Sequence, residues 1–472
     1  MQKAFWTRWG GALLLVTACN GGGGADDGRE TSGGSINPTI GGGATDDAGD
    51  ASGGQDAGEG EGDGGGDGGG QSDDSATQGG SADDGGGDSG VPKFDLGIQP
   101  DIAPQTQCEP GGGGGGGGGG MRKGPDFSYL WAANSTQGTI SKIDTETVTE
   151  VGRFQVRPDG AGSPSRTAVS LSGNVAVASR SGGVTKFYAS IDDCVESNGT
   201  PGIQTSMNNA ALPWDQEECR AWHTPFGYST QRPVAWGQGE WNYETCQWEN
   251  ELLWTAGRNG STTDAEVLLM DGDDGTVLDS VIVNGLHADI YGIYGAAVDA
   301  EGNFWGSQLS GRRLIKVNLA DMTSEVWTPP VVSGYGMTVD VDGFVWICAS
   351  TMQRFDPATG TWAQSAAGLG YAGCMADGAE GGLLWTSTAA GVIRGINRQT
   401  LLVEQEFSVP GSYGISIDFN GYIWAVANSG GAHRVDPVTG AVQSYNGLVG
   451  AYTYSDMTGA ALSSVSGTGP TG

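Results

Sequence analysis

Histidine and basic side chains are scarce in this chain of 472 residues. It contains three His and 22 Lys and Arg against 55 Asp and Glu, for a formal charge of −33. The first 120 residues hold 19 acids and four bases, which leaves 36 acids and 18 bases beyond Gly120. Because nucleic-acid binding requires a basic surface, this composition excludes nucleic acid as a partner.

A long apolar run is missing at the start of the chain. The run from about Ala12 to Ala18 is far shorter than the roughly 20 residues that cross a bilayer, so it is typical of a secretory signal. The order Val-Thr-Ala-Cys that ends at Cys19 resembles a bacterial lipobox. This resemblance implies that residues 1–18 are a lipoprotein signal peptide and that Cys19 is lipidated. The alternative is an ordinary cleaved signal with an incidental cysteine.

Aromatic residues are absent from Asn20 to Gly90, where glycine and acidic residues predominate. Such a segment buries too little apolar surface to offset the entropy of ordering it. We therefore expect residues 19–120, which end in ten consecutive glycines, to be a disordered acidic tether. The protein would lie in the bacterial cell envelope outside the cytoplasm, held to a membrane through its lipid anchor only. The sequence does not decide between inner and outer membrane.

A repeated sequence organises the rest of the chain. The stretch YGMTVDVDGFVWICAS, from Tyr335, has close copies that begin at Tyr294 and Tyr413. Successive tryptophans of the repeat are 41, 39 and 39 residues apart, at Trp305, Trp346, Trp385 and Trp424. A period near 40 with short apolar runs is typical of four strands per unit in a β-propeller. With weaker copies upstream, residues 121–472 are predicted to form an all-β, seven-bladed propeller.

Two segments depart from the period. TGAAL around Gly459 matches the first strand YGAAV around Gly295, and the first unit lacks such a strand. The C-terminus is therefore predicted to close the ring with its own strand. An insertion at about 190–250, rich in Trp, Cys and Glu, is expected to form a long loop on one face.

Aspartates recur at one place in the repeat, in the pattern Asp-x-x-Gly at Asp299, Asp340 and Asp418. A carboxylate there can accept backbone N–H bonds while glycine adopts a positive φ. Because a catalytic site is asymmetric, recurrence in several units favours turn capping over catalysis.

No cysteine pair has the CxxC spacing of a zinc site, so disulfides are favoured for the six cysteines other than Cys19. Cys348 follows Trp346 on a second strand and Cys374 lies on the first strand of the next unit, which predicts an inter-blade disulfide. The pairing of the others stays open, namely Cys108, Cys194, Cys219 and Cys246.

The pattern Gly-Ile-x-x-Asp-x-x-Gly-x-x-Trp resembles virginiamycin B (streptogramin) lyase-type propellers and the wider NHL-like group. The resemblance implies a lyase site in which His and Glu hold magnesium and move a proton. Here the positions that match the histidines are Tyr294, Tyr335, Tyr371 and Tyr413. Those that match the glutamate are Gln308, Ala349, Thr388 and Ala427. None of these acts as a base at neutral pH or binds magnesium strongly, so no catalytic residue is predicted.

The four tyrosines, with Arg166 and Arg232 at comparable positions, form a candidate binding site in the funnel. Tyr and Arg suit recognition of glycans, peptides or proteins. The alternative is that they only plug a narrow channel. Other candidates are His287 beside Asp289, more typical of a loop pair, and a partial calcium-like loop at Glu196, Asn198 and Thr200, where Pro201 replaces the required glycine.

The leading hypothesis is a monomeric envelope lipoprotein that presents a propeller for binding an envelope protein, peptide or glycan. It requires no cofactor and no metal site. The alternative is a metal-dependent lyase or lactonase-like hydrolase on the same propeller, for which calcium or magnesium would be the cofactor. A third hypothesis is a purely structural component of the envelope.

Overall fold

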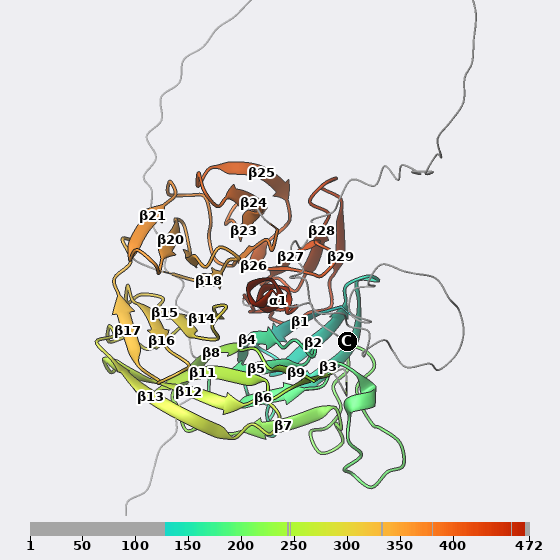
Figure 1. Ribbon diagram of the computed structural model, residues 1–472. Helices are drawn as coiled ribbons and strands as arrows, with labels where there is room; N and C mark the ends of the chain where they lie inside the picture. Colours follow the sequence, from blue (N-terminus) through green and yellow to red (C-terminus); the bar gives the residue numbers. More distant parts are fainter. Residues whose placement is uncertain are drawn as a thin grey trace, which may run out of the picture. The chain divides into compact units, whose positions relative to one another are not determined.

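The computed structural model describes residues 128–467 apart from 243, 244, 246, 332, 333, 380 and 455, all within the unit Gly86–Gly472. Seven small antiparallel sheets surround a central axis (Figure 1). The predicted seven-bladed β-propeller is therefore confirmed. The signal peptide, Cys19, the tether over 19–120, Cys108 and Cys246 lie outside the described residues.

Each blade is built in chain order from the axis outward. Blades 1 and 2 contain β1 (Tyr129–Asn134), β2 (Thr139–Asp144), β3 (Thr149–Gln155), β4 (Pro164–Val169), β5 (Val175–Ser179), β6 (Val184–Phe187) and β7 (Arg220–Thr224). Blades 3 and 4 contain β8 (Thr230–Trp236), β11 (Leu252–Arg258), β12 (Asp264–Asp271), β13 (Val277–Asn284), β14 (Gly295–Val298), β15 (Phe304–Ser307), β16 (Leu314–Val317) and β17 (Ser324–Trp327). Blades 5 to 7 contain β18 (Gly336–Val339), β19 (Val345–Cys348), β20 (Met352–Asp356), β21 (Thr361–Gln364), β22 (Cys374–Ala376), β23 (Leu383–Ser387), β24 (Val392–Asn397), β25 (Val403–Ser408), β26 (Ser412–Ile417), β27 (Ile423–Ala427), β28 (Ala432–Val435) and β29 (Val442–Tyr445).

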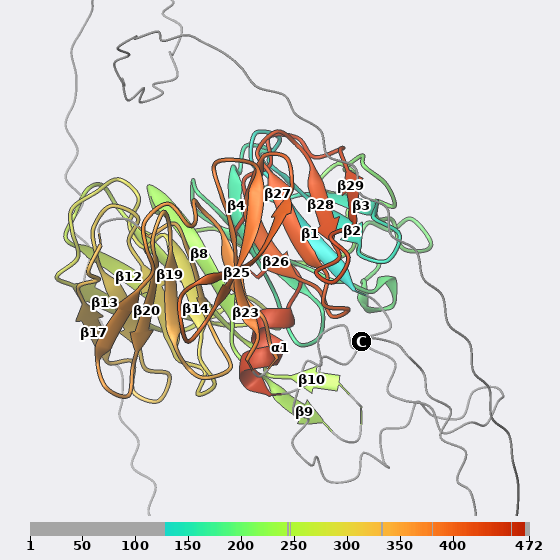
Figure 2. The same cartoon turned by 90° about the horizontal axis from the view of Figure 1, so that it is seen from above.

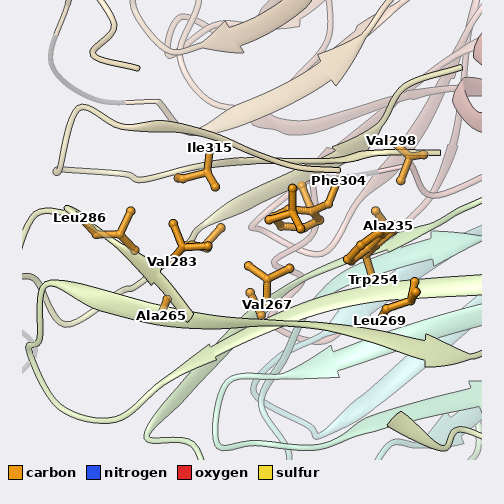
Figure 3. Packing of buried hydrophobic residues seen from close by; sticks show 14 residues of the cluster. Ala235, Trp254, Ala265, Val267, Leu269, Val283, Leu286, Val298, Phe304 and Ile315 are labelled. Carbon is orange, nitrogen blue, oxygen red and sulfur yellow. The ribbon is translucent and has the colours of Figure 1, made fainter. Parts of the chain in front are cut away.

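The core lies between adjacent blades, where apolar side chains of facing sheets interdigitate. Between blades 3 and 4, Trp254 packs against Phe304 with ring centroids 5.8 Å apart, and Val267 and Ile315 complete the layer (Figure 3). Truncation of a buried aromatic of this kind to alanine costs about 3–5 kcal/mol. The repeated tryptophans are thus first of all the inter-blade core.

The recurring aspartates have a structural role, as predicted. In blade 5, one carboxylate oxygen of Asp340 accepts the backbone N–H groups of Asp342 and Phe344, at 3.0 and 2.9 Å. Its other oxygen accepts the indole N–H of Trp346 at 2.7 Å. The same indole bond, also 2.7 Å long, joins Asp299 to Trp305 and Asp418 to Trp424. The repeat therefore specifies a turn together with an anchored tryptophan.

The C-terminal segment closes the ring, although only part of it is extended. Trp131 donates its backbone N–H to Met457 at 2.8 Å, and Tyr452 donates to Ala133 at 3.0 Å. An isolated antiparallel bridge joins Asn134 to Ala451. The C-terminal segment thus takes the innermost position of blade 1, as predicted.

The stretch that resembles the strand YGAAV is instead a helix, α1 (Ala460–Ser466), which lies at the centre of the ring (Figure 1). Gly459 turns the chain at φ 87°, and the buried carboxylate of Asp456 accepts the N–H groups of Gly459 and Leu462 at 2.9 and 3.1 Å. The capped first turn and the two alanines after it favour a helix over a strand. Among residues 128–467, no helix is long and apolar enough to span a bilayer.

The single loop expected over about 190–250 is divided in two, because β7 and β8 within it are regular blade strands. The first part, 188–219, is closed by a disulfide between Cys194 and Cys219. The second contains a small hairpin, β9 (Glu240–Asn242) and β10 (Gln247–Glu249). The predicted disulfide between Cys348 and Cys374 is present and joins blade 5 to blade 6. Two disulfides indicate an oxidising compartment outside the cytoplasm.

The antiparallel pairing gives the ring two distinct faces. The innermost strands all start on one of them, which we call the mouth face, at Pro164, Thr230, Gly295, Gly336, Cys374 and Ser412. The far face carries the turns after these strands and after the third strands, and thus both parts of the insertion. In the side view α1 emerges beside the β9–β10 hairpin (Figure 2).

Candidate functional site: a tyrosine and arginine cluster at the channel mouth

The sequence-predicted funnel residues all lie at or just before the start of an innermost strand. Arg166 and Arg232 lie in β4 and β8, and Tyr413 lies in β26. Tyr294 and Tyr335 immediately precede β14 and β18, and Tyr371 lies three residues before β22. Because these strands converge on the axis, the repeat register brings the six side chains to one end of the channel.

The four tyrosines make a continuous set of edge-to-face contacts. Ring centroids are 5.3 Å apart for Tyr294 and Tyr335, 5.4 Å for Tyr335 and Tyr413, and 5.6 Å for Tyr371 and Tyr413. Tyr294 and Tyr413 are buried, with 1% and 6% of their surface exposed, whereas Tyr371 is 46% exposed. The cluster therefore has a buried base and an accessible rim.

Sequence reasoning missed the centre of the cluster, which comes from the closing segment. The Tyr452 hydroxyl forms hydrogen bonds with the hydroxyls of Tyr294, Tyr335 and Tyr454, the second at 2.6 Å and the third at 3.2 Å. Tyr291 also joins the cluster, with its ring centroid 5.8 Å from that of Tyr294. The alternating tyrosines at 452 and 454 were a signal that side chains on one face of an extended segment meet the channel.

Three arginines stack on these rings. The Arg166 guanidinium carbon lies 3.2 Å from the Tyr454 ring centroid, and Arg166 also donates to the backbone oxygen of Tyr294 at 2.9 Å. The corresponding carbon of Arg180, which was not predicted, lies 4.4 Å from the Tyr452 ring centroid. Arg232 lies over Tyr294 at 5.1 Å. Cation–π contacts of this kind fix both partners in place.

The hydrogen bonds give the tyrosine hydroxyls unequal acidities. Burial raises the pKa of Tyr452, but hydrogen bonds with Tyr294, Tyr335, Tyr454 and Tyr413 outweigh it and lower the pKa to about 8. Burial, followed by the neighbouring tyrosines, raises the pKa of Tyr335 and of Tyr413. Tyr452 is therefore the shared hydrogen-bonding partner at the centre of the cluster.

The other candidate sites are used for local structure. Asp289 pairs with Arg258 at 3.1 Å rather than with His287, whose side chain is exposed. Gln308, which takes a position matched to the lyase glutamate, bonds to the backbone of His287. In the calcium-like loop, the Asn198 side chain accepts the N–H of Thr200 at 2.8 Å, as in a turn. Within the described ranges, no three His, Cys, Asp or Glu residues are grouped to hold a metal ion.

No protein-family profile matches the chain, and neither does any curated protein sequence. Among solved structures, virginiamycin B lyase from Staphylococcus aureus is similar with a TM-score of 0.41 and 14% identity over 60% of this chain and 83% of the lyase. AztD from Citrobacter koseri has a TM-score of 0.42 and 11% identity, over 70% of this chain and 96% of AztD. The dihydro-heme d1 dehydrogenase NirN has a TM-score of 0.41 and 11% identity, over 69% of this chain and 78% of NirN. The expected resemblance to lyase-type propellers thus holds for the fold alone.

Proposed function

We propose that this chain is an envelope lipoprotein that uses the mouth of its propeller to bind an envelope protein, peptide or glycan. The observation that carries the proposal is the tyrosine and arginine cluster, which we define as Arg166, Arg180, Arg232, Tyr291, Tyr294, Tyr335, Tyr371, Tyr413, Tyr452 and Tyr454. These residue types dominate binding energies because they are rigid, amphipathic and rich in donors.

The rim of the cluster supports recognition over simple plugging of the channel. Packing alone would be satisfied by the buried rings of Tyr294, Tyr413 and Tyr454. Tyr371 instead leaves nearly half of its surface in solvent, and its hydroxyl has no hydrogen bond to a described residue. An exposed aromatic at the edge of a preorganised cluster costs little entropy to bind a ligand.

The anchor and tether belong to the same proposal. A lipid at Cys19 would hold the chain to the membrane, and residues 19–120 would let the propeller reach partners at a distance. Replacement of Cys19 by serine would release the protein from the membrane fraction of the native host. The alternative, a metal-dependent lyase or hydrolase, has no observation in its favour among the described residues.

A comparison of variants tests the binding role. The full chain, the Tyr371→Ala variant and the control Tyr422→Ala are used as baits in an envelope extract. Tyr422 lies on the far face, between β26 and β27, so its loss leaves the mouth intact. We expect a component that the wild type and Tyr422→Ala retain and that Tyr371→Ala retains at least tenfold less. The proposal is wrong if every retained component survives Tyr371→Ala combined with Arg232→Gln.

A further inference from the structure

Charge is segregated between the two faces of the propeller. The far-face connection 188–219 alone carries six carboxylates and no Lys or Arg. On the mouth face, the described connections between strands of the whole ring carry Arg157, Arg180, Arg312 and Arg313 against two carboxylates, Asp159 and Asp289. A chain of strongly negative net charge thus presents a locally basic surface around the tyrosine and arginine cluster. An anion approaching this face is attracted, because the far-face charges are screened over about 8–10 Å in salt.

Two arginines at the mouth lack an anionic partner. Arg180 directly follows β5, and its backbone oxygen accepts the N–H of Gln231 at 3.2 Å, which holds it across the seam between blades 2 and 3 next to Arg232. The Nε atoms of both arginines are buried without a hydrogen bond to any described residue. Neither is in an ion pair among those residues, whereas Asp289 is already paired with Arg258.

The two charges also act on each other. Burial and then the charge of Arg232 lower the pKa of Arg180, which means that the folded protein carries a repulsion between like charges. An anion between the two guanidinium groups would remove this repulsion and supply the missing acceptors. Carboxylate and sulfate match the planar fork of arginine, and such bonds are about twice as strong as neutral ones.

Building on the proposed function, we infer that the ligand is an acidic oligosaccharide whose carboxylate or sulfate group binds between Arg180 and Arg232. The neighbouring sugar ring would lie on the half-buried Tyr291, whose ring centroid is 5.2 Å from the guanidinium carbon of Arg232, since aromatic faces pack against the apolar side of a sugar.

Calorimetric titration of the full chain with matched ligands tests this inference. The probes are tetragalacturonic acid, its methyl ester and a sulfated disaccharide. We expect the acid or the sulfated sugar to bind, the ester to bind at least tenfold more weakly, and Arg180→Gln and Arg232→Gln each to lose about tenfold in affinity. Arg232→Lys keeps the charge without the planar fork and should bind with intermediate affinity. Comparison of the affinities for the acid and for the sulfated sugar shows whether the site prefers a carboxylate or a sulfate group.

The control is Arg434→Gln, which removes the same charge from β28, where Arg434 donates to the backbone oxygen of Glu146 at 3.0 Å on the far face. This variant should bind as the wild type does. Equal binding of acid and ester, or unchanged affinity in both arginine variants, would overturn the inference. If no sugar binds but the extract yields a partner that depends on Tyr371, such as a peptide with a free carboxylate, the saccharide class is wrong and the proposed function stands. If Tyr371→Ala also retains every component of the extract that the wild type retains, both the saccharide inference and the proposed function are wrong.

Discussion

Removal of the central hydroxyl of the cluster, in Tyr452→Phe, has a consequence that the structure allows us to estimate. The Tyr452 hydroxyl accepts a hydrogen bond from Tyr454 and shares one each with the hydroxyls of Tyr294 and Tyr335. Phenylalanine keeps the ring contacts and the cation–π contact with Arg180 but leaves these buried hydroxyls without their shared hydrogen-bonding partner. A buried unsatisfied donor costs about 1–3 kcal/mol, and partial relaxation of the rings leads us to expect a loss of about 2–4 kcal/mol.

The same variant has a pH signature. The pKa of Tyr452 in the folded protein is lowered to about 8, below the usual value near 10. A group with a depressed pKa in the folded state contributes stability above its unfolded pKa, and that contribution disappears as the pH falls through the folded pKa. The stability difference between wild type and Tyr452→Phe should therefore increase as the pH rises from 7 to 10.

Two measurements check this prediction. Denaturant unfolding with the disulfides intact, at pH 7 and pH 9, gives the free energies of unfolding. Absorbance at 295 nm should show one tyrosine that titrates near pH 8 in the wild type and is absent from Tyr452→Phe. The control Tyr371→Phe removes a solvent-exposed hydroxyl and should change stability by less than about 0.5 kcal/mol. If Tyr452→Phe is as stable as this control and the titration curve is unchanged, the description of Tyr452 as the shared hydrogen-bonding partner of the cluster is refuted.

Three further predictions concern stability. Burial raises the pKa of Asp377 to about 6, so the stability that this carboxyl group contributes below pH 4 is lost as the pH rises through 6. In denaturant unfolding, Asp377→Asn should therefore be more stable than the wild type by about 1–3 kcal/mol at pH 7, but not at pH 4. Loss of the inter-blade disulfide in a Cys348→Ala, Cys374→Ala double variant should cost about 2–4 kcal/mol and lower the Tm measured by calorimetry, whereas an unchanged Tm would mean that the bond constrains little. EDTA, calcium and magnesium should leave the Tm unchanged in thermal-shift assays, since the described residues offer no grouped ligands, and a shift of several degrees would revive the metal-dependent alternative.

Much of this protein follows from its sequence alone. The 40-residue period, the Asp-x-x-Gly turns and the buried tryptophans specify the blades, because each depends on residues only a few positions apart. The blade register also located the disulfide between Cys348 and Cys374 and placed Tyr294, Tyr335 and Tyr413 at one end of the channel. Local repetition is sufficient for these inferences, because equivalent residues of a repeat occupy equivalent places around a ring.

The centre of the candidate site was decided by tertiary structure alone. Tyr452 meets Tyr294 across 158 residues of sequence and Tyr335 across 117, and only closure of the ring brings the C-terminal segment to that position. Likewise, the sequence at the start of α1 resembles that of a strand in the repeat. Hydrogen bonds to the Asp456 carboxylate and the position of the segment on the channel axis stabilise a helix instead. Contacts between such distant segments depend on how seven blades close around an axis, which no local pattern of residues encodes.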